Sequence, residues 1–185
     1  FLRGHSIMPL ITPDNDDTVT VTGTIDETQC LITATIITPR VDRQGDITEP
    51  AGCQLAMFAT NPVVLLNHAR QHPLPIGSGA DASGRLMVDV TKSVVTATTR
   101  FAQSDQIAMQ AFRLCADGVL KGWSAGFNPL KGGATELGRH PLSGNPCYRF
   151  TNYELFEYSL TPTPANPDAL TVAVQKSMVG GETMH

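Results

Sequence analysis

The sequence predicts a mostly β fold with added helices: a single-domain β-barrel of about six or seven strands. Several short segments alternate between apolar and polar residues and are rich in β-branched side chains. Residues 105–117 instead have the apolar spacing of an amphipathic helix. A length of 185 residues suits one domain with its own core. We expect a flexible leader over 1–17, the domain over 18–175 and a flexible tail over 176–185.

Two strands open the predicted domain. Residues 18–25 and 31–38 alternate threonine with apolar side chains, and Asp26-Glu27-Thr28 supplies the turn between them. Residues 41–48 contain Asp42, Gly45 and Asp46 and predict an ordered loop.

The middle of the chain starts with a short predicted helix. It covers about residues 54–59 and is stopped by Pro62, since the residue before a proline is disfavoured in a helix. Residues 63–66 form a compact apolar strand, and His68 follows its end.

Strands are next predicted over 84–90 and 94–101. The amphipathic helix over 105–117 follows, with Gly118 where a C-terminal cap belongs. A further strand is predicted over 120–130.

The last part of the chain predicts a glycine-rich loop over 131–146 and one long strand over 148–161. Residues 164–168 predict the start of a helix, with Asn166 as its N-cap and a proline at the first helical position.

The charge and the cysteines exclude several classes of protein. The chain has 13 basic and 17 acidic residues and a net charge of -4, so it lacks the basic excess of a nucleic-acid binder. No apolar run approaches the roughly 18 residues of a membrane span. The four cysteines are widely spaced without a CxxC pair, which predicts free buried thiols rather than disulfides or structural zinc: Cys30, Cys53, Cys115 and Cys147.

Ser124 is the candidate nucleophile. Alternation places it on the face opposite Trp123, with Gly122 and Gly126 as its same-face neighbours. A hydroxyl between two glycines leaves room for a substrate backbone to approach. The same pattern also fits a β-bulge or a close contact between strands.

His68 is the candidate general base, because an imidazole at a strand end titrates near working pH. A partly buried histidine with a structural role is the alternative. The other four histidines lie in predicted loops or near the ends of the sequence: His5, His72, His140 and His185.

Glu157 is the candidate acid. Alternation predicts Phe156, Tyr158 and Leu160 on one strand face, with Leu155, Glu157 and Ser159 on the other. A carboxylate there could orient a histidine and stabilise its protonated form. A solvated strand residue is the alternative, and the competing acids are Glu154, Asp42 and Asp46.

Four segments resemble, in the same order, the prohead maturation proteases of tailed bacteriophages. They are VDRQGD (41–46), NPVVLLNH (61–68), GVLKGWSAGF (118–127) and EYSLTPTPANP (157–167). The resemblance covers roughly residues 19–170.

The resemblance implies a serine endopeptidase with a fold similar to that of herpesvirus assembly proteases, a β-barrel flanked by helices. Carried over by position, Ser124 is the nucleophile, His68 the base and Glu157 the acid, where herpesvirus relatives use a second histidine. Such enzymes need no cofactor or metal. The oxyanion donors would come from the glycine-rich segments around Ser124 or from the loop after Leu130.

The expected substrates are the scaffold and capsid proteins, and the enzyme itself, inside the procapsid in the host bacterial cytoplasm. Neither nucleic acid nor a membrane is an expected partner. Self-association, for instance as a dimer through the helix over 105–117, is also expected. The alternative is a non-catalytic β-barrel module of capsid or tube assembly that keeps the protease fold.

Overall fold

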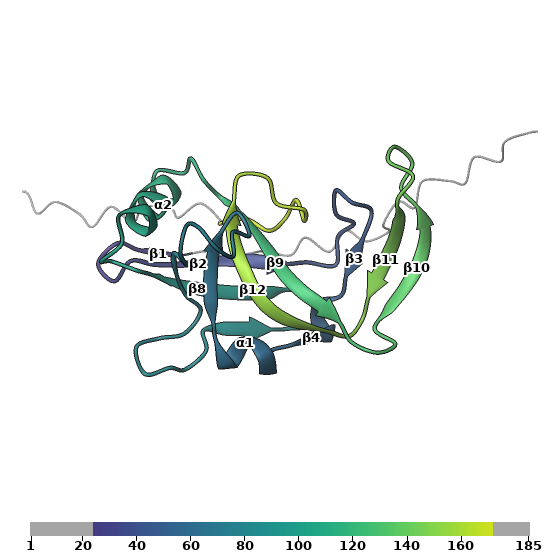
Figure 1. The fold of residues 1–185 in the computed structure, drawn as a ribbon, viewed down its shortest axis with the longest axis horizontal. Helices are drawn as coiled ribbons and strands as arrows, with labels where there is room; N and C mark the ends of the chain where they lie inside the picture. Colours follow the sequence, from purple (N-terminus) through teal and green to yellow (C-terminus); the bar gives the residue numbers. More distant parts are fainter. Residues whose placement is uncertain (1–23, 172–185) are drawn as a thin grey trace, which may run out of the picture.

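The computed structural model describes residues 24–171 (Figure 1). It contains twelve strands, two α-helices and one short 3-10 helix in that range. In chain order the elements are β1 (Ile25–Asp26), β2 (Leu31–Ile37), β3 (Ile47–Thr48), η1 (Pro50–Gly52), β4 (Cys53–Gln54), α1 (Ala56–Thr60), β5 (Val63–Leu66), β6 (Gly77–Ser78), β7 (Val88–Val90), β8 (Val95–Phe101), α2 (Gln106–Ala116), β9 (Gly122–Pro129), β10 (Ala134–Arg139), β11 (Pro146–Phe150) and β12 (Tyr153–Thr161).

Nine strands form one sheet that curls into a half-barrel (Figure 1). Its order is β1-β2-β8-β6-β5-β12-β4, with β7 also paired to β8 and β9 paired to β12. The long strand β12 organises this sheet: it pairs antiparallel with β9 and parallel with both β4 and β5. Because β5 and β9 come from distant parts of the chain, β12 brings two segments of the sequence together. The expected mostly β fold is confirmed, but the main sheet is a half-barrel of nine strands and not a barrel of about six or seven. Several of these strands have only two or three residues and are too short to show alternation in the sequence.

Aromatic side chains lie at the centre of the core. Trp123, Tyr158 and Phe58 are each completely buried, and their rings contact one another through Tyr158. The indole Nε1–H of Trp123 donates to Thr171 Oγ1 at 2.7 Å, so its one polar atom is satisfied although buried. The β8 strand alternates buried and less buried residues, as a sheet with one face on a core must.

The helix α2 agrees with its prediction. Asp105 caps its first turn by accepting the backbone N–H of Ala108 at 2.7 Å. Gly118 follows the helix with φ +71°, the left-handed conformation that glycine adopts most easily. The buried face of α2 consists of Ala108, Ala111, Phe112 and Cys115.

The segment after Leu130 differs from its prediction. The predicted loop over 131–146 contains strand β10, and the predicted strand over 148–161 is two strands, β11 and β12, separated at residues 151–152. β10, β11 and β3 form a second sheet beside the half-barrel (Figure 1). Most of β10 is exposed, so it lacks the apolar alternation by which a strand is recognised in a sequence.

The predicted helix at 164–168 is also wrong. Asn166 instead uses its Oδ1 to accept the backbone N–H of Asp168 at 3.0 Å, which forms a turn. Its Nδ2 donates to the Thr38 carbonyl oxygen at 2.9 Å and fastens this loop beside the end of β2. The chain then pairs with the start of β9 and does not continue as a helix: Trp123 N–H donates to the Ala169 carbonyl and Thr171 N–H to the Lys121 carbonyl.

Some predictions concern residues that lie partly or wholly outside 24–171, the range that the structure describes. Of the strand predicted over 18–25, only the end, Ile25, lies in a described strand; residues 18–23, the leader and the residues after 171 lie outside the described range. The four cysteines are free and buried, as predicted. None of the helices within 24–171 is long and apolar enough to span a membrane.

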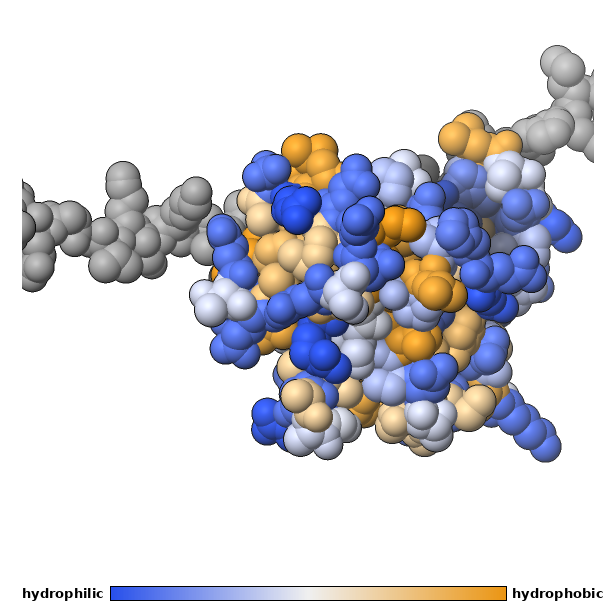
Figure 2. All heavy atoms as spheres, turned by 60° about the vertical axis from the view of Figure 1, so that its left-hand side comes forward, coloured by the Kyte–Doolittle hydropathy of each residue, from blue (hydrophilic) through white to orange (hydrophobic). Residues whose placement is uncertain are grey.

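On the face in Figure 2, apolar side chains form several separate groups among polar ones.

Candidate active site

A β-bulge in β12 determines where Glu157 points. The pairing of β12 with β9 shifts between Leu155 and Glu157, so that Phe156 has no partner of its own. Leu155 is buried in the core with Tyr158, and Glu157 turns to the opposite face. The predicted alternation was therefore wrong for Leu155 and Phe156, because a bulge is not visible in a sequence pattern. It was right in placing Glu157 and Tyr158 on opposite faces of the strand.

His68 lies in a tight turn at the end of β5. Asn67 and His68 both have positive φ, +58° and +57°, and the Ala69 N–H donates to the Leu66 carbonyl at 3.1 Å. Two consecutive left-handed residues within such a turn define the type I′ class. The turn directs the His68 side chain back toward β12, where it meets Glu157.

The His68 Nδ1 and Glu157 Oε1 atoms are 2.7 Å apart. Only 3% of the Glu157 side chain is exposed, compared with 43% of the His68 side chain. An ionised carboxylate can only accept, so Nδ1 carries the proton and donates it to Oε1. In a neutral imidazole held in this tautomer, Nε2 is the nitrogen that can accept a proton.

Ser124 lies two strands from His68, across β12. In the pairing of β9 with β12, Ser124 stands directly opposite Ser159, and Glu157 stands opposite Gly126. Directly paired residues project from the same face of a sheet. Ser124 and Glu157 therefore share one face, while Trp123 is buried on the other. Within residues 24–171 no hydrogen bond joins the Ser124 hydroxyl to His68; such contacts are often long without substrate.

A pocket opens beside Ser124. Its lining includes Ser124 and Phe127 from β9, Ile37 from β2, and Arg40 and Asn166 from two loops. The Arg40 guanidinium donates to Asp168 Oδ1 at 2.6 Å and so holds the loop after β12 next to the pocket. Ser124, the candidate nucleophile, therefore forms part of the wall of a small pocket.

The competing acids are not near His68. Glu154 is paired with Asn128 in β9 and Gln54 in β4, at the other end of β12. Asp42 Oδ1 accepts backbone N–H groups of its own loop, and Asp46 Oδ1 accepts the N–H of Tyr148 at 2.7 Å. Of the four candidate carboxylates, the structure brings only Glu157 to His68.

The described cysteines and the acidic and histidine side chains outside the site were also compared with the needs of thiol and metal sites. Burial raises the pKa of the Cys53 thiol to about 11 and that of Cys115 to about 12, so few thiolates form at neutral pH. Among residues 24–171, no cluster of three or more histidine, cysteine, aspartate or glutamate side chains is placed to hold a metal ion.

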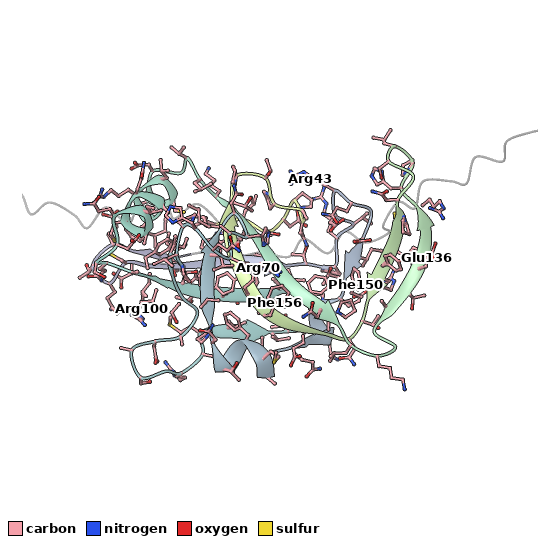
Figure 3. The ribbon with its side chains drawn as sticks, in the orientation of Figure 1. Arg43, Arg70, Arg100, Glu136, Phe150 and Phe156 are labelled. Atoms are coloured by element: carbon pink, nitrogen blue, oxygen red, sulfur yellow. The ribbon has the colours of Figure 1, made fainter. Side chains whose placement is uncertain are left out.

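Two residues near this site were not recognised from the sequence. Ser159 is fully buried and hydrogen-bonded to both Glu157 and His68. Its only sequence signal was its position two residues from Glu157 on the same face. Arg70 places its guanidinium 4.9 Å from the centre of the Phe156 ring (Figure 3), which attaches the segment after His68 to the bulge in β12. No sequence pattern indicated this contact.

A serine hydroxyl and a histidine–carboxylate pair on one face of a sheet are the arrangement of a serine hydrolase. The comparison with protein families gives the particular group. The family model of the caudovirus prohead serine protease matches residues 50–183, more than half of the chain and all three candidate residues. The chain belongs to this family, as the resemblance implied, and is a serine peptidase of procapsid maturation. Neither the curated proteins nor the solved structures contained a match.

Proposed function

We propose that this protein is an endopeptidase in which Ser124, His68 and Glu157 form the catalytic triad. Its substrates are the scaffold protein, the scaffold-like parts of the capsid protein, and the enzyme itself, cleaved inside the procapsid. The observation that carries the proposal is the 2.7 Å hydrogen bond between His68 Nδ1 and Glu157 Oε1, on the sheet face that also presents Ser124. Membership of the prohead protease family supports cleavage inside the procapsid.

The chemistry follows from the protonation of the imidazole. His68 Nε2 accepts the Ser124 proton while Oγ attacks the carbonyl carbon of the scissile peptide bond. When the C–N bond breaks, the imidazolium returns this proton to the leaving amine, and an acyl group remains on Oγ. Water, activated by the same nitrogen, then hydrolyses the ester and regenerates the hydroxyl.

Glu157 contributes through its burial. Its carboxylate is almost completely removed from water, so it interacts more strongly with the transient imidazolium than an exposed acid would. It also keeps Nδ1 protonated, which leaves Nε2 as the basic atom. The negative charge on the former carbonyl oxygen needs N–H donors in addition.

Co-expression with the capsid and scaffold proteins tests this function. Mass spectrometry of the termini of all three chains should show new ends with the wild type and none with Ser124→Ala. A serine-directed fluorophosphonate should label the wild type at Ser124 alone. Ser78→Ala is a matched control, because Ser78 is also a half-buried strand serine next to glycines. Unlabelled protein and uncleaved partners would favour the non-catalytic assembly module.

We further propose that the protein self-associates. The α2 helix buries one apolar face and exposes Ile107 to 38%. Specific activity should rise with enzyme concentration, and sedimentation velocity should show a species larger than the monomer. Full activity at concentrations where only monomer sediments would contradict this expectation.

A further inference from the structure

Ser159 occupies a central position among the three candidate catalytic residues. Its side chain is fully buried in β12. It stands opposite Ser124 in the pairing with β9 and opposite Leu65 in the pairing with β5. It is also two residues from Glu157 on the same strand face.

The Ser159 hydroxyl makes two hydrogen bonds. Its Oγ donates to Glu157 Oε2 at 2.8 Å and accepts the backbone N–H of His68 at 3.1 Å. A backbone N–H can only donate, so the hydroxyl must accept there. Its single proton is therefore directed to the carboxylate.

The two oxygens of Glu157 are thus held separately. Oε1 binds the His68 ring and Oε2 binds Ser159, so the carboxylate plane cannot rotate without breaking one of these bonds. With 3% of the side chain exposed, no bulk water can replace a lost partner. The bond to the His68 N–H also holds the backbone of a residue whose φ is +57°.

We infer that Ser159 is a positioning residue that aligns the Glu157 carboxylate with the imidazole of His68. It does not touch substrate and acts through those two residues. The inference rests on the proposed function, because it assigns Ser159 to the same triad. It predicts that loss of this hydroxyl lowers kcat and leaves KM nearly unchanged.

The first test is steady-state kinetics with three variants. Ser159→Ala should lower kcat roughly 10- to 100-fold, the loss seen in metalloenzymes when the hydrogen-bond partner of a metal-binding side chain is removed. Ser159→Thr keeps a hydroxyl and should restore most of the turnover. If Ser159→Ala does not fold, Ser159→Cys replaces it, since a thiol has similar size and is a weak donor. Thr99→Val removes another buried hydroxyl, one bonded to Tyr158 at 3.0 Å, and should leave kcat unchanged.

The second test is independent of turnover. An imidazole Nδ1–H bonded to a carboxylate gives a far-downfield proton resonance. It should be present in the wild type, Ser159→Thr and Ser124→Ala, and broadened or shifted upfield in folded Ser159→Ala or Ser159→Cys. A Ser159→Ala enzyme with full kcat and an unchanged resonance would overturn the inference, as would a wild type without the resonance or a folded Ser159→Thr as slow as Ser159→Ala. Activity that survives in Ser124→Ala would contradict the proposed function instead, and the resonance would still decide the role of Ser159.

Discussion

The Glu157 carboxylate lies over the α-carbon of Gly126 in the neighbouring strand. A Cβ added at Gly126 would overlap Oε1, Cδ and Cγ of Glu157. Gly126 does not have a positive φ, so glycine is needed here for space and not for backbone conformation. The glycine that flanks Ser124 on its sheet face therefore makes room for the carboxylate of the candidate triad.

Gly126→Ala should therefore inactivate the enzyme without unfolding it. The atoms in the way belong mainly to the end of a flexible side chain, so the carboxylate can move aside while the strands stay paired. Turnover should fall toward that of a Glu157 variant, measured as kcat on a scaffold peptide, with circular dichroism unchanged.

Gly84→Ala is the control for this change. It adds the same methyl group in open space at φ +88°, and so it costs some stability without affecting the site. Equal losses of turnover in the two variants would show that Gly126 has no special relation to Glu157.

Glu157→Gln should give a folded but slow enzyme. An amide beside Nδ1 permits the wrong imidazole tautomer, and loss of the corresponding acid in another serine protease costs about 10⁴ in turnover. Glu154→Gln, at the other end of β12, should remain close to wild type in kcat. Because Gly126→Ala acts through the same carboxylate, the double variant should be no slower than Glu157→Gln alone. Full activity of Glu157→Gln would remove this residue from the triad.

The elements that follow apolar periodicity were predictable. β8, β9 and α2 show it, β5 is a continuous apolar run, and the sequence placed all four within a few residues. β10 was missed because its side chains are mostly exposed, and the bulge at Phe156 because it breaks alternation without leaving a signature. The predictable elements are those that bury one face.

The residues of the candidate site also differ in whether the sequence could indicate them. Ser124 and Glu157 could be proposed as candidates because each faces away from an apolar strand face, and the structure confirms these faces. Ser159 could not be recognised, because its hydrogen bond with His68 depends on the parallel pairing of β12 with β5, which joins segments about 90 residues apart. No local pattern gives the register of such a pair.

Asp42→Asn should stabilise the fold at neutral pH. Burial, as the largest cause, raises the pKa of Asp42 above its usual value although backbone N–H groups oppose the shift. A carboxyl whose pKa is raised on folding stabilises the fold below its unfolded pKa, and this contribution is lost as the pH rises through the folded pKa. The ionised Asp42 is thus unfavourable at pH 7, whereas asparagine stays neutral and keeps the Oδ1 acceptor for the N–H groups of Gln44 and Asp46.

Urea unfolding of both proteins from pH 3 to pH 8 measures this effect. The advantage of Asp42→Asn should be present at pH 7 and should shrink as the pH falls and Asp42 in the wild type becomes protonated. Asp81→Asn is an informative comparison of opposite sign, since hydrogen bonds from Ser83 and Arg85 lower the pKa of Asp81 to about 2. A wild type that is more stable than Asp42→Asn at pH 7 would show that the hydrogen bonds outweigh burial.

Asn67 should stabilise the turn that contains His68. It has φ +58°, a conformation that costs most L-residues roughly 1–2 kcal/mol and that asparagine tolerates better. Its Oδ1 also accepts the Thr161 hydroxyl at 3.0 Å, which fastens the turn to β12. Asn67→Ala loses both contributions and should lower the free energy of unfolding by about 1–2 kcal/mol. Asn67→Gly restores the conformational freedom without the hydrogen bond and should lie between Asn67→Ala and the wild type.

The two variants also separate turn stability from catalysis. If the turn positions the His68 ring, kcat should fall in the order wild type, Asn67→Gly, Asn67→Ala, together with the His68 Nδ1–H resonance. Thr161→Val removes the same hydrogen bond from the other partner and leaves the backbone of Asn67 unchanged. It also removes the acceptor of the Thr163 N–H, at 3.3 Å, so it should be at least as destabilising as Asn67→Gly. An Asn67→Ala protein as stable and as active as the wild type would show that Asn67 contributes nothing to the turn, and that the bonds to Ser159 and Glu157 and the strand pairing hold His68 without it.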